Sequence, residues 1–212
     1  MKLALSLAAL AALAVAPAHA TLLTTDPHVY TVTPSHRIRL EFPVGELKVI
    51  PSDDAKVRFD IKVRCDGRWT DDCEERANRL ILDSDDSGGT LSLKLHKYPQ
   101  WHNAGMKVMG ELRVPRALAV DIEMGVGELD IQGLEGDIEV DLGVGEADVR
   151  ALRARASHVS VETGIGDAEI RGGGSGTSSR GFIGSHAVWT DGVGHAEVRL
   201  HVGVGDATVH LE

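Results

Sequence analysis

The sequence predicts an all-β protein built from stacked, solenoid-like rungs, and three observations lead to this prediction. A motif with two glycines around one apolar residue, followed directly by an acid in most copies, occurs six times. Apolar and polar residues alternate through much of the remaining chain, which is typical of half-buried strands. Only residues 71–79 have the composition of a short helix. A β-sandwich is the alternative fold.

The first 20 residues have the pattern of a cleaved secretory signal peptide. Lys2 supplies a positive charge, residues 3–15 form an apolar stretch, and Ala18-His19-Ala20 is an A-x-A cleavage site. The apolar stretch is too short to span a membrane, so a retained anchor is the weaker alternative, and we expect no membrane span after cleavage. We therefore expect residues 21–212 to form one exported domain, located in the periplasm, with secretion or the cell surface as alternatives.

The charge of the chain excludes two classes of partner. The formal net charge is −10 at pH 7 with neutral histidines, and loss of Lys2 makes it about −11. An acidic protein is repelled by nucleic acids and by anionic membrane surfaces. We therefore expect neither as a partner, and the charge itself is typical of a soluble surface.

Cys65 and Cys73 are the two cysteines of the chain. In an oxidising compartment, a pair at this spacing predicts a disulfide that closes a short loop. A metal site is the alternative, but two thiols would need further ligands.

The chain before the main repeats contains shorter alternating segments. Apolar residues occupy every second position over residues 38–44 and 57–63, and shorter runs follow at 91–95 and 112–114. The helix at 71–79 has Asp71 or Asp72 as its N-cap, and residues 80–82 either extend it or form a short strand. Polar turns are expected at 51–54 and 83–89, and an irregular loop at 97–109.

The repeats follow each other at steps of 18, 21, 28 and 11 residues from residue 125 onward. A period near 20 in strand-forming sequence is typical of a coiled β architecture, and the longest step contains a glycine- and serine-rich insertion at 172–179. The sixth copy, at residues 42–49, lies far upstream. The second glycines of the six copies are Gly45, Gly127, Gly145, Gly166, Gly194 and Gly205.

Inside each motif the alternation of apolar and polar residues shifts by one position, which we call the parity slip. Apolar residues before and after the motif would therefore point to opposite faces of a regular strand. Ile122, Met124 and Val126 share one face of a strand, whereas Leu129 and Ile131 after the motif have the opposite parity. A regular strand cannot bury both sets, so we expect a bulge or corner at the second glycine, where a positive φ favours glycine. The first glycine is replaced by Pro43 in one copy, which requires a negative φ. We assign that position to close approach of neighbouring backbones.

The residue after the second glycine would form a column along the stacked rungs, at about 4.8 Å per rung. Its members are Glu46, Glu128, Glu146, Asp167, His195 and Asp206. We interpret these carboxylates as acceptors for backbone N–H groups at the bend. A ladder of divalent cations is the alternative. The calcium-binding nonapeptide repeat places its acid two residues after a glycine, and here His195 interrupts the column, which argues against that type of site.

The sequence combines a signal peptide, a strand-rich first part with a short helix, and recurring G-φ-G-[DE]-φ-x-φ units. In these features it resembles the bacterial putative-adhesin domain family of unknown function. The resemblance covers roughly residues 36–212. It implies an all-β, solenoid-like domain in exported or membrane-tethered proteins. It supplies no catalytic motif, and it implies no cofactor.

The leading functional hypothesis is a non-catalytic exported module that binds a surface or envelope ligand, either glycan or protein, or acts as an envelope scaffold. Repeated ladders build a long rigid surface, and we find no pairing of a nucleophile with a base. The best local candidate for ligand contact is the loop with Tyr98, Trp101 and His102, because aromatic residues on loops often contact ligands. Packing of Trp101 against the end of the domain is the alternative.

Two further functions are weaker alternatives. An enzyme acting on acidic polysaccharide would need an acidic metal site with a basic residue, for which Asp148 beside Arg150, Arg153 and Arg155 is the candidate run; a solvated connection between repeats explains that run equally. A zinc or copper site would use His195 and His201, which we expect to point outward.

Overall fold

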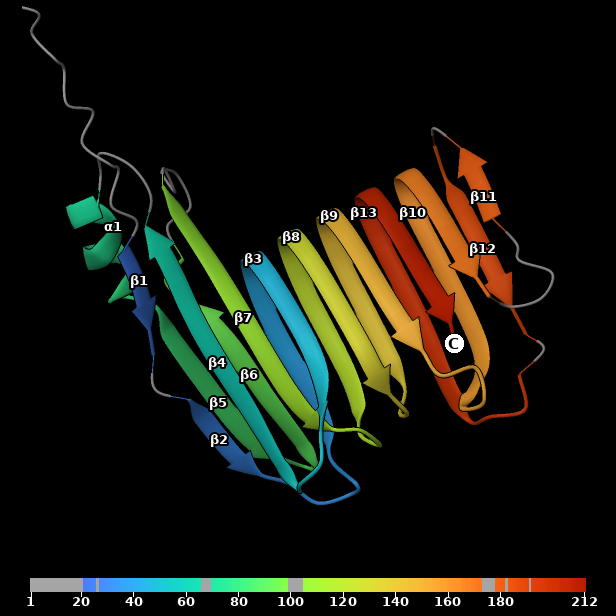
Figure 1. The fold of residues 1–212 in the computed structure, drawn as a ribbon, viewed down its shortest axis with the longest axis horizontal. Coiled ribbons are helices and arrows are strands. Elements are labelled where there is room, and N and C mark those ends of the chain that lie inside the picture. The colour runs from blue at the N-terminus through green and yellow to red at the C-terminus, as the bar shows by residue number, and fades with distance from the viewer. Residues whose placement is uncertain are drawn as a thin grey trace, which may run out of the picture.

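The computed structural model of the protein describes residues 21–25, 27–65, 70–98, 105–172, 178–181, 183–190 and 192–212. The predicted signal peptide lies outside these residues. The described chain is nearly all-β, with one short helix and a large open sheet of 13 strands (Figure 1). Its elements are β1 (Thr21–Thr24), β2 (His28–Thr31), β3 (Arg37–Ser52), β4 (Lys56–Cys65), α1 (Thr70–Ala77), β5 (Ile81–Ser87), β6 (Thr90–His96), β7 (Met106–Pro115), β8 (Ala119–Leu134), β9 (Ile138–Ala151), β10 (Ala156–Arg171), β11 (Ser178–Gly181), β12 (Ser185–Trp189) and β13 (Ala196–Leu211).

Five long parallel strands form the middle of the sheet, in the spatial order β3, β8, β9, β13 and β10. β13 follows all the others in sequence, yet it lies between β9 and β10 and is parallel to both (Figure 1). The order of the repeats in space therefore differs from their order along the chain. The shorter strands extend the sheet beyond β3 on one side and beyond β10 on the other.

Each long strand bends near its middle, and its two arms pair with different strands at the ends of the sheet. The first arm of β3 pairs with β6, where Ile38 lies opposite Leu91, and its second arm pairs with β7, where Val49 lies opposite Leu112. At the other end, the first arm of β10 pairs with β12 and the second with β11. Figure 1 shows the resulting curl of the strands.

The core lies between the arms. Phe42 on the first arm of β3 and Leu47 on the second arm both approach Gly110 of β7, and Phe59 of β4 meets them there. The rings of Phe42 and Phe59 pack edge to face with centroids 6.3 Å apart, an arrangement that favours aromatic pairs. A side chain on Gly110 would lie within about 3.0–3.2 Å of all three residues, so the glycine makes room for them.

The second glycine of the motif adopts a positive φ in five of its six copies, namely 139° at Gly45, 146° at Gly127, 144° at Gly145, 132° at Gly166 and 132° at Gly205. This region is accessible to glycine and strained for other residues. A Cβ on Gly145 would also lie 1.8 Å from the carbonyl oxygen of Gly127 on the neighbouring rung. Both the backbone conformation and the packing therefore require glycine at these bends.

Gly194 is the exception to the predicted set of bend glycines. It has no positive φ, and it lies in the turn before β13 rather than inside a strand. Its amide donates a hydrogen bond to the carbonyl of Ala156. The bend of β13 lies instead at Gly205, because the glycines of the preceding motif copy, Gly192 and Gly194, lie before the strand.

The first glycines are packed against neighbouring backbone. A Cβ on Gly143 would lie 2.6 Å from the carbonyl oxygen of Gly125, and a Cβ on Gly203 would lie 2.5 Å from that of Gly143. Neither φ is positive. These distances agree with the assignment of the first glycine to close backbone approach.

The middle residue of the motif differs from the expectation. The alternation predicts that Val126 shares the buried face of Ile122 and Met124, but Val126 is 46% exposed, and the equivalent Val144 is 45% exposed. The reason is that the bend spans the whole glycine–apolar–glycine unit, which turns the middle side chain outward at the corner. Burial resumes with Leu129, two residues after the second glycine of the motif.

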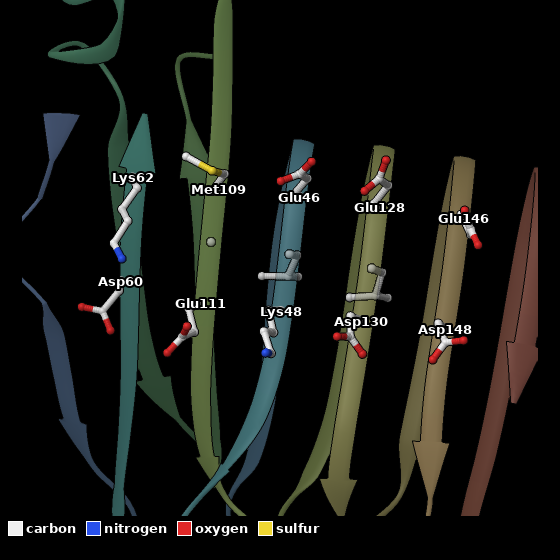
Figure 2. A pocket seen from close by; sticks show the side chains of 13 residues that line it. Glu46, Lys48, Asp60, Lys62, Met109, Glu111, Glu128, Asp130, Glu146 and Asp148 are labelled. Carbon is white, nitrogen blue, oxygen red and sulfur yellow. The ribbon is translucent and has the colours of Figure 1, made fainter. Parts of the chain in front are cut away.

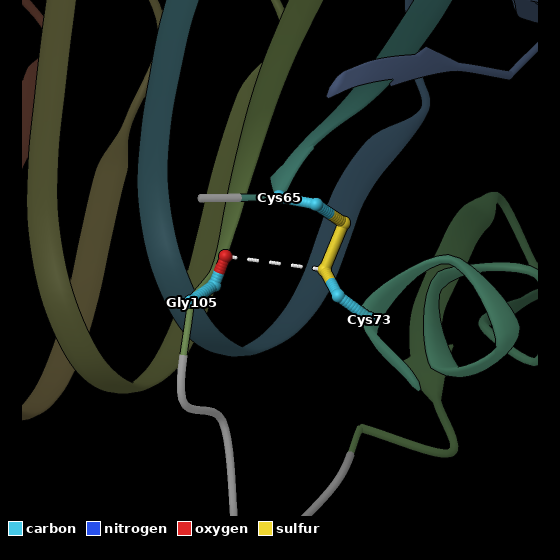
Figure 3. The surroundings of a disulfide bond; sticks show 3 residues. All are labelled: Cys65, Cys73 and Gly105. Atoms are coloured by element: carbon cyan, nitrogen blue, oxygen red, sulfur yellow. Dashed lines mark hydrogen bonds between the residues drawn. A yellow bond between two sulfur atoms is a disulfide. The ribbon is translucent and has the colours of Figure 1, made fainter. Parts of the chain in front are cut away.

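Cys65, at the end of β4, and Cys73, in α1, form the predicted disulfide, with their Cα atoms 5.9 Å apart (Figure 3). Sγ of Cys73 also lies 3.9 Å from the carbonyl oxygen of Gly105. The helix covers residues 70–77 rather than 71–79, and residues 81–87 form β5, which includes most of the predicted polar turn. Among the described residues, no helix has the length and apolarity required to cross a bilayer.

Candidate functional site

A groove with a volume of about 490 Å³ crosses the outer face of β4, β7 and the second arms of β3, β8 and β9 (Figure 2). It lies on the side of the sheet opposite to the core, because its side chains alternate with buried residues such as Leu47 and Leu129. Its lining residues are Glu46, Leu47, Lys48, Asp60, Lys62, Met109, Gly110, Glu111, Glu128, Leu129, Asp130, Glu146 and Asp148.

Two columns of side chains cross the groove, because the register of the strands places them opposite each other. The first column runs from Lys62 through Met109, Glu46 and Glu128 to Glu146. The second column is Asp60, Glu111, Lys48, Asp130 and Asp148. Figure 2 shows both columns projecting from neighbouring strands. The groove is therefore assembled by pairing between distant segments rather than by one loop.

Seven carboxylates and two lysines line the groove. Glu46 forms an ion pair with Lys107, and Glu111 forms one with Arg113. Arg150 lies between two further acids, 3.2 Å from Asp130 and 3.3 Å from Asp148.

The remaining three acids of the groove have no such partner. Within the described part of the chain, Asp60, Glu128 and Glu146 form no ion pair. The groove therefore carries uncompensated negative charge next to apolar contact surface, an arrangement that favours a cationic ligand with an apolar body.

The predicted column of acids exists, but its composition differs from the prediction. In spatial order it contains Glu46, Glu128, Glu146, Asp206 and Asp167, one from each long strand. His195 is not a member, because it lies in the turn before β13 with its amide bonded to the carbonyl of Arg155. The amide of Asp167 donates to Oδ1 of Asp206 over 3.0 Å, which is the predicted bonding of a backbone N–H at one position of the column.

The aromatic loop can be placed only in part. Tyr98 is partly buried and packs against the hydrophobic core, whereas Trp101 and His102 lie outside the described residues. Tyr98 does not line the acidic groove. The sequence pattern does not predict the acidic groove, because its residues are spread over five strands whose pairing the repeats do not reveal.

The histidines and the arginine-containing run that the sequence suggests as alternative sites do not come together into one site. His201 lies on the first arm of β13 and its Nδ1 is 3.3 Å from Asp141, while His195 lies outside the strand. Arg150 belongs to β9, and Arg155 lies in the following turn, 3.2 Å from Glu135. Among the described residues, no group of three histidine, cysteine or acidic side chains is arranged to hold a metal ion.

No protein-family model matches the sequence, and no curated protein matches it. Among solved structures, the chain is similar to a putative cell adhesion protein from Clostridium sporogenes, with a TM-score of 0.54 and 14% sequence identity, over 88% of this chain and 99% of the other. A putative adhesin from Bacteroides fragilis covers 89% of this chain and 97% of its own length at 12% identity, but its TM-score is 0.30. At this identity the first similarity establishes the fold alone.

Proposed function

We propose that this chain is an exported, non-catalytic binding module, built as a β-solenoid with adhesin-like character, which recognises a cationic surface ligand through the acidic groove. The bent parallel strands, paired at a step of 18 residues between β8 and β9, support the solenoid description. The fold similarity to a protein named as a putative cell adhesion protein is consistent with a binding role. The disulfide is consistent with an oxidising location.

The single observation that carries the proposal is the charge imbalance of the groove. Seven carboxylates and two lysines line a space of about 490 Å³, which is large enough for a small ligand, and four of the acids are paired with Lys107, Arg113 and Arg150. Asp60 and Glu128 have no ion-pair partner in the described chain. The half-buried side chain of Met109 supplies apolar contact beside these acids. A ligand with amino groups on a partly apolar body, such as an amino sugar or a lysine side chain, would satisfy both features.

Calorimetry with two matched glycans tests the proposal. Glucosamine oligosaccharides carry amino groups, whereas their N-acetylated counterparts of the same length are neutral. We expect the charged oligosaccharides to bind and the neutral ones to bind at least about tenfold more weakly, because the groove offers carboxylates without cationic partners. Equal affinity for both, or no binding of either, would contradict the proposal.

Two pairs of substitutions with the same change in charge locate the binding. Asp60→Asn with Asp130→Asn removes two acids from the groove, whereas Asp83→Asn with Glu139→Gln removes two exposed acids away from it. We expect the first pair to weaken binding of the charged oligosaccharide about tenfold and the second pair to leave it unchanged. Equal weakening by both pairs would indicate general attraction to an acidic protein rather than a site.

A further inference from the structure

A row of exposed β-branched side chains runs along the bends of the five long strands. Its members, in spatial order, are Val44, Val126, Val144, Val204 and Ile165, and the strand register places each one opposite the next. We call this row the bend ladder. Four of its members are 44–46% exposed, and Val44 at the β3 end is half-buried.

The bend ladder stands between two rows that have no side chains over most of their length. Gly125, Gly143, Gly203 and Gly164 precede the ladder residues on four rungs, and Gly127, Gly145, Gly205 and Gly166 follow them. A groove of about 520 Å³ lies along the first of these rows and is lined by Gly125, Gly143 and Gly203, with Glu123 and Asp141 among its walls. A partner can therefore approach the backbone closely beside an apolar ridge.

Acidic side chains flank the ladder on both sides. Two residues after the ladder lie Glu46, Glu128, Glu146, Asp206 and Asp167. Three residues before it lie Glu41, Glu123, Asp141 and Glu162, and His201 takes the place of an acid on β13. Lys94 and Lys107 form ion pairs with the two acids of β3. On the other four strands, Glu123, Glu128, Glu146, Asp167 and Asp206 form no ion pair in the described chain.

The charge pattern distinguishes between possible partners of this surface. A second copy of the chain would bring like-charged rows together, and an anionic membrane would be repelled by both rows. A partner with an apolar stripe between two rows of lysine or arginine would instead match the apolar ladder and both acidic rows. This is the charge pattern of a basic amphipathic helix.

The spacing of the ladder also favours a helix over a strand. Rungs repeat at about 4.8 Å, whereas side chains on one face of an extended strand repeat at roughly 6.6–6.8 Å. The turns of a helix repeat at about 5.4 Å, and the five rungs span about 19 Å, the length of roughly 13 helical residues. The backbone at the bends is already paired with neighbouring rungs on both sides, so a partner strand could not add to the sheet there.

We propose that the bend ladder and its two acidic rows form a docking surface for a basic amphipathic helix of a partner protein. The helix would place its apolar face on Val126, Val144 and Val204 and its flanking lysine or arginine side chains over the acids of both rows. As in other helix-mediated recognition, anchor residues one turn apart on the helix would contact the apolar surface. The surface is separate from the part of the acidic groove formed by β4 and β7, although Glu128 and Glu146 border both.

Peptides of one composition but different pattern test the proposal. The probe is a leucine–lysine peptide whose leucines form one helical face flanked by lysines. Its controls are the same composition in scrambled order and the same pattern with glutamate in place of lysine. We expect the patterned peptide to bind at physiological salt and to gain helical circular dichroism, the scrambled peptide to bind at least about tenfold more weakly, and the glutamate peptide not to bind. Equal binding of the patterned and scrambled peptides would overturn the proposal.

Substitutions in the ladder locate the site. Val144→Ser with Val204→Ser removes apolar surface that is already half exposed, so the fold should persist, and we expect about a tenfold loss of peptide affinity. Val193→Ser is the matched control, because Val193 is 90% exposed but lies outside the ladder. Unchanged affinity in the double variant would overturn the proposal.

Two further measurements separate the other occupants. Sedimentation of the wild type without peptide detects self-association, and flotation with anionic vesicles detects membrane binding. We expect a monomer that does not bind the vesicles. A dimer or vesicle binding that is lost in Val144→Ser with Val204→Ser would assign the ladder to a second copy or to lipid and would overturn the proposal.

Discussion

Glu128 of β8 and Glu146 of β9 lie directly opposite each other on adjacent parallel strands, and neither forms an ion pair within the described chain. Like charges in this position destabilise a sheet. The protein therefore retains an unfavourable contact at a surface for which we propose ligands that carry positive charge. Proteins often retain contacts that lower stability at surfaces that serve a function.

Glu146→Gln should stabilise the fold, because it removes the repulsion from Glu128. We expect the free energy of unfolding to rise by about 0.2–1 kcal/mol, with the larger gain at low salt, where the repulsion is least screened. Urea denaturation at low and high salt measures this. Asp121→Asn is the control of opposite sign, because Asp121 accepts a hydrogen bond of 2.8 Å from Arg39. Destabilisation by Glu146→Gln would contradict the assignment.

Gly145→Ala should destabilise the fold strongly. The residue has a φ of 144°, and its new Cβ would lie 1.8 Å from the carbonyl oxygen of Gly127. Backbone strain and displacement of the neighbouring rung together should cost about 3 kcal/mol or more. Gly88→Ala is the control, since Gly88 has a φ of 59° with no atom within 4 Å, so only about 1 kcal/mol is expected. Thermal unfolding distinguishes the two variants, and equal costs would refute the packing argument.

Loss of the disulfide should lower stability without changing the fold. The bond joins residues eight positions apart, and closure of such a loop restricts the unfolded chain by about 2–3 kcal/mol. Cys65→Ser with Cys73→Ser should therefore unfold at lower denaturant concentration than the wild type. The far-ultraviolet circular dichroism should not change. The same midpoint for both proteins would show that the bond adds nothing to stability.

The Arg58 guanidinium and the Ser52 hydroxyl donate hydrogen bonds to the Asp54 carboxylate and hold the pKa of that group well below its usual range. Because the folded-state pKa is lowered, this stabilising contribution is present above the unfolded-state pKa near 3.9. It is lost as the pH falls through the folded-state value. Arg58→Met should raise the pKa of Asp54 toward its usual value, which carboxyl NMR titration measures. No change on substitution would show that Arg58 is not the main cause.

The sequence predicted the all-β class and the disulfide because both follow from local signals. Alternation marks the strands, and a pair of cysteines in a chain expected to be exported predicts the bond. The parity slip also located the bend at glycines such as Gly127. It could not tell how many residues the corner includes, so Val126 was placed with the buried face although it points outward.

The candidate sites could not be predicted, because they depend on which strands become neighbours. Asp60 and Glu146 line one groove although they are far apart in sequence, and no local pattern relates them. Val204 follows Val144 in the bend ladder while Ile165, which precedes Val204 in the chain, lies beyond it. His195 was wrongly assigned to the acidic column for the same reason, since its motif copy lies in a turn and the second copy, at Asp206, occupies the rung.

The position of β13 between β9 and β10 has a consequence for the way this chain reaches its native state. Neither neighbour can acquire its permanent pairing partner on that side until the residues of β13 have been synthesised and released. β9 and β10, which are consecutive in the chain, must not pair with each other before β13 is in place. The parallel pairing of the repeat region therefore cannot be completed by progressive winding from the N-terminal side, and the non-local contacts of β13 favour slow folding.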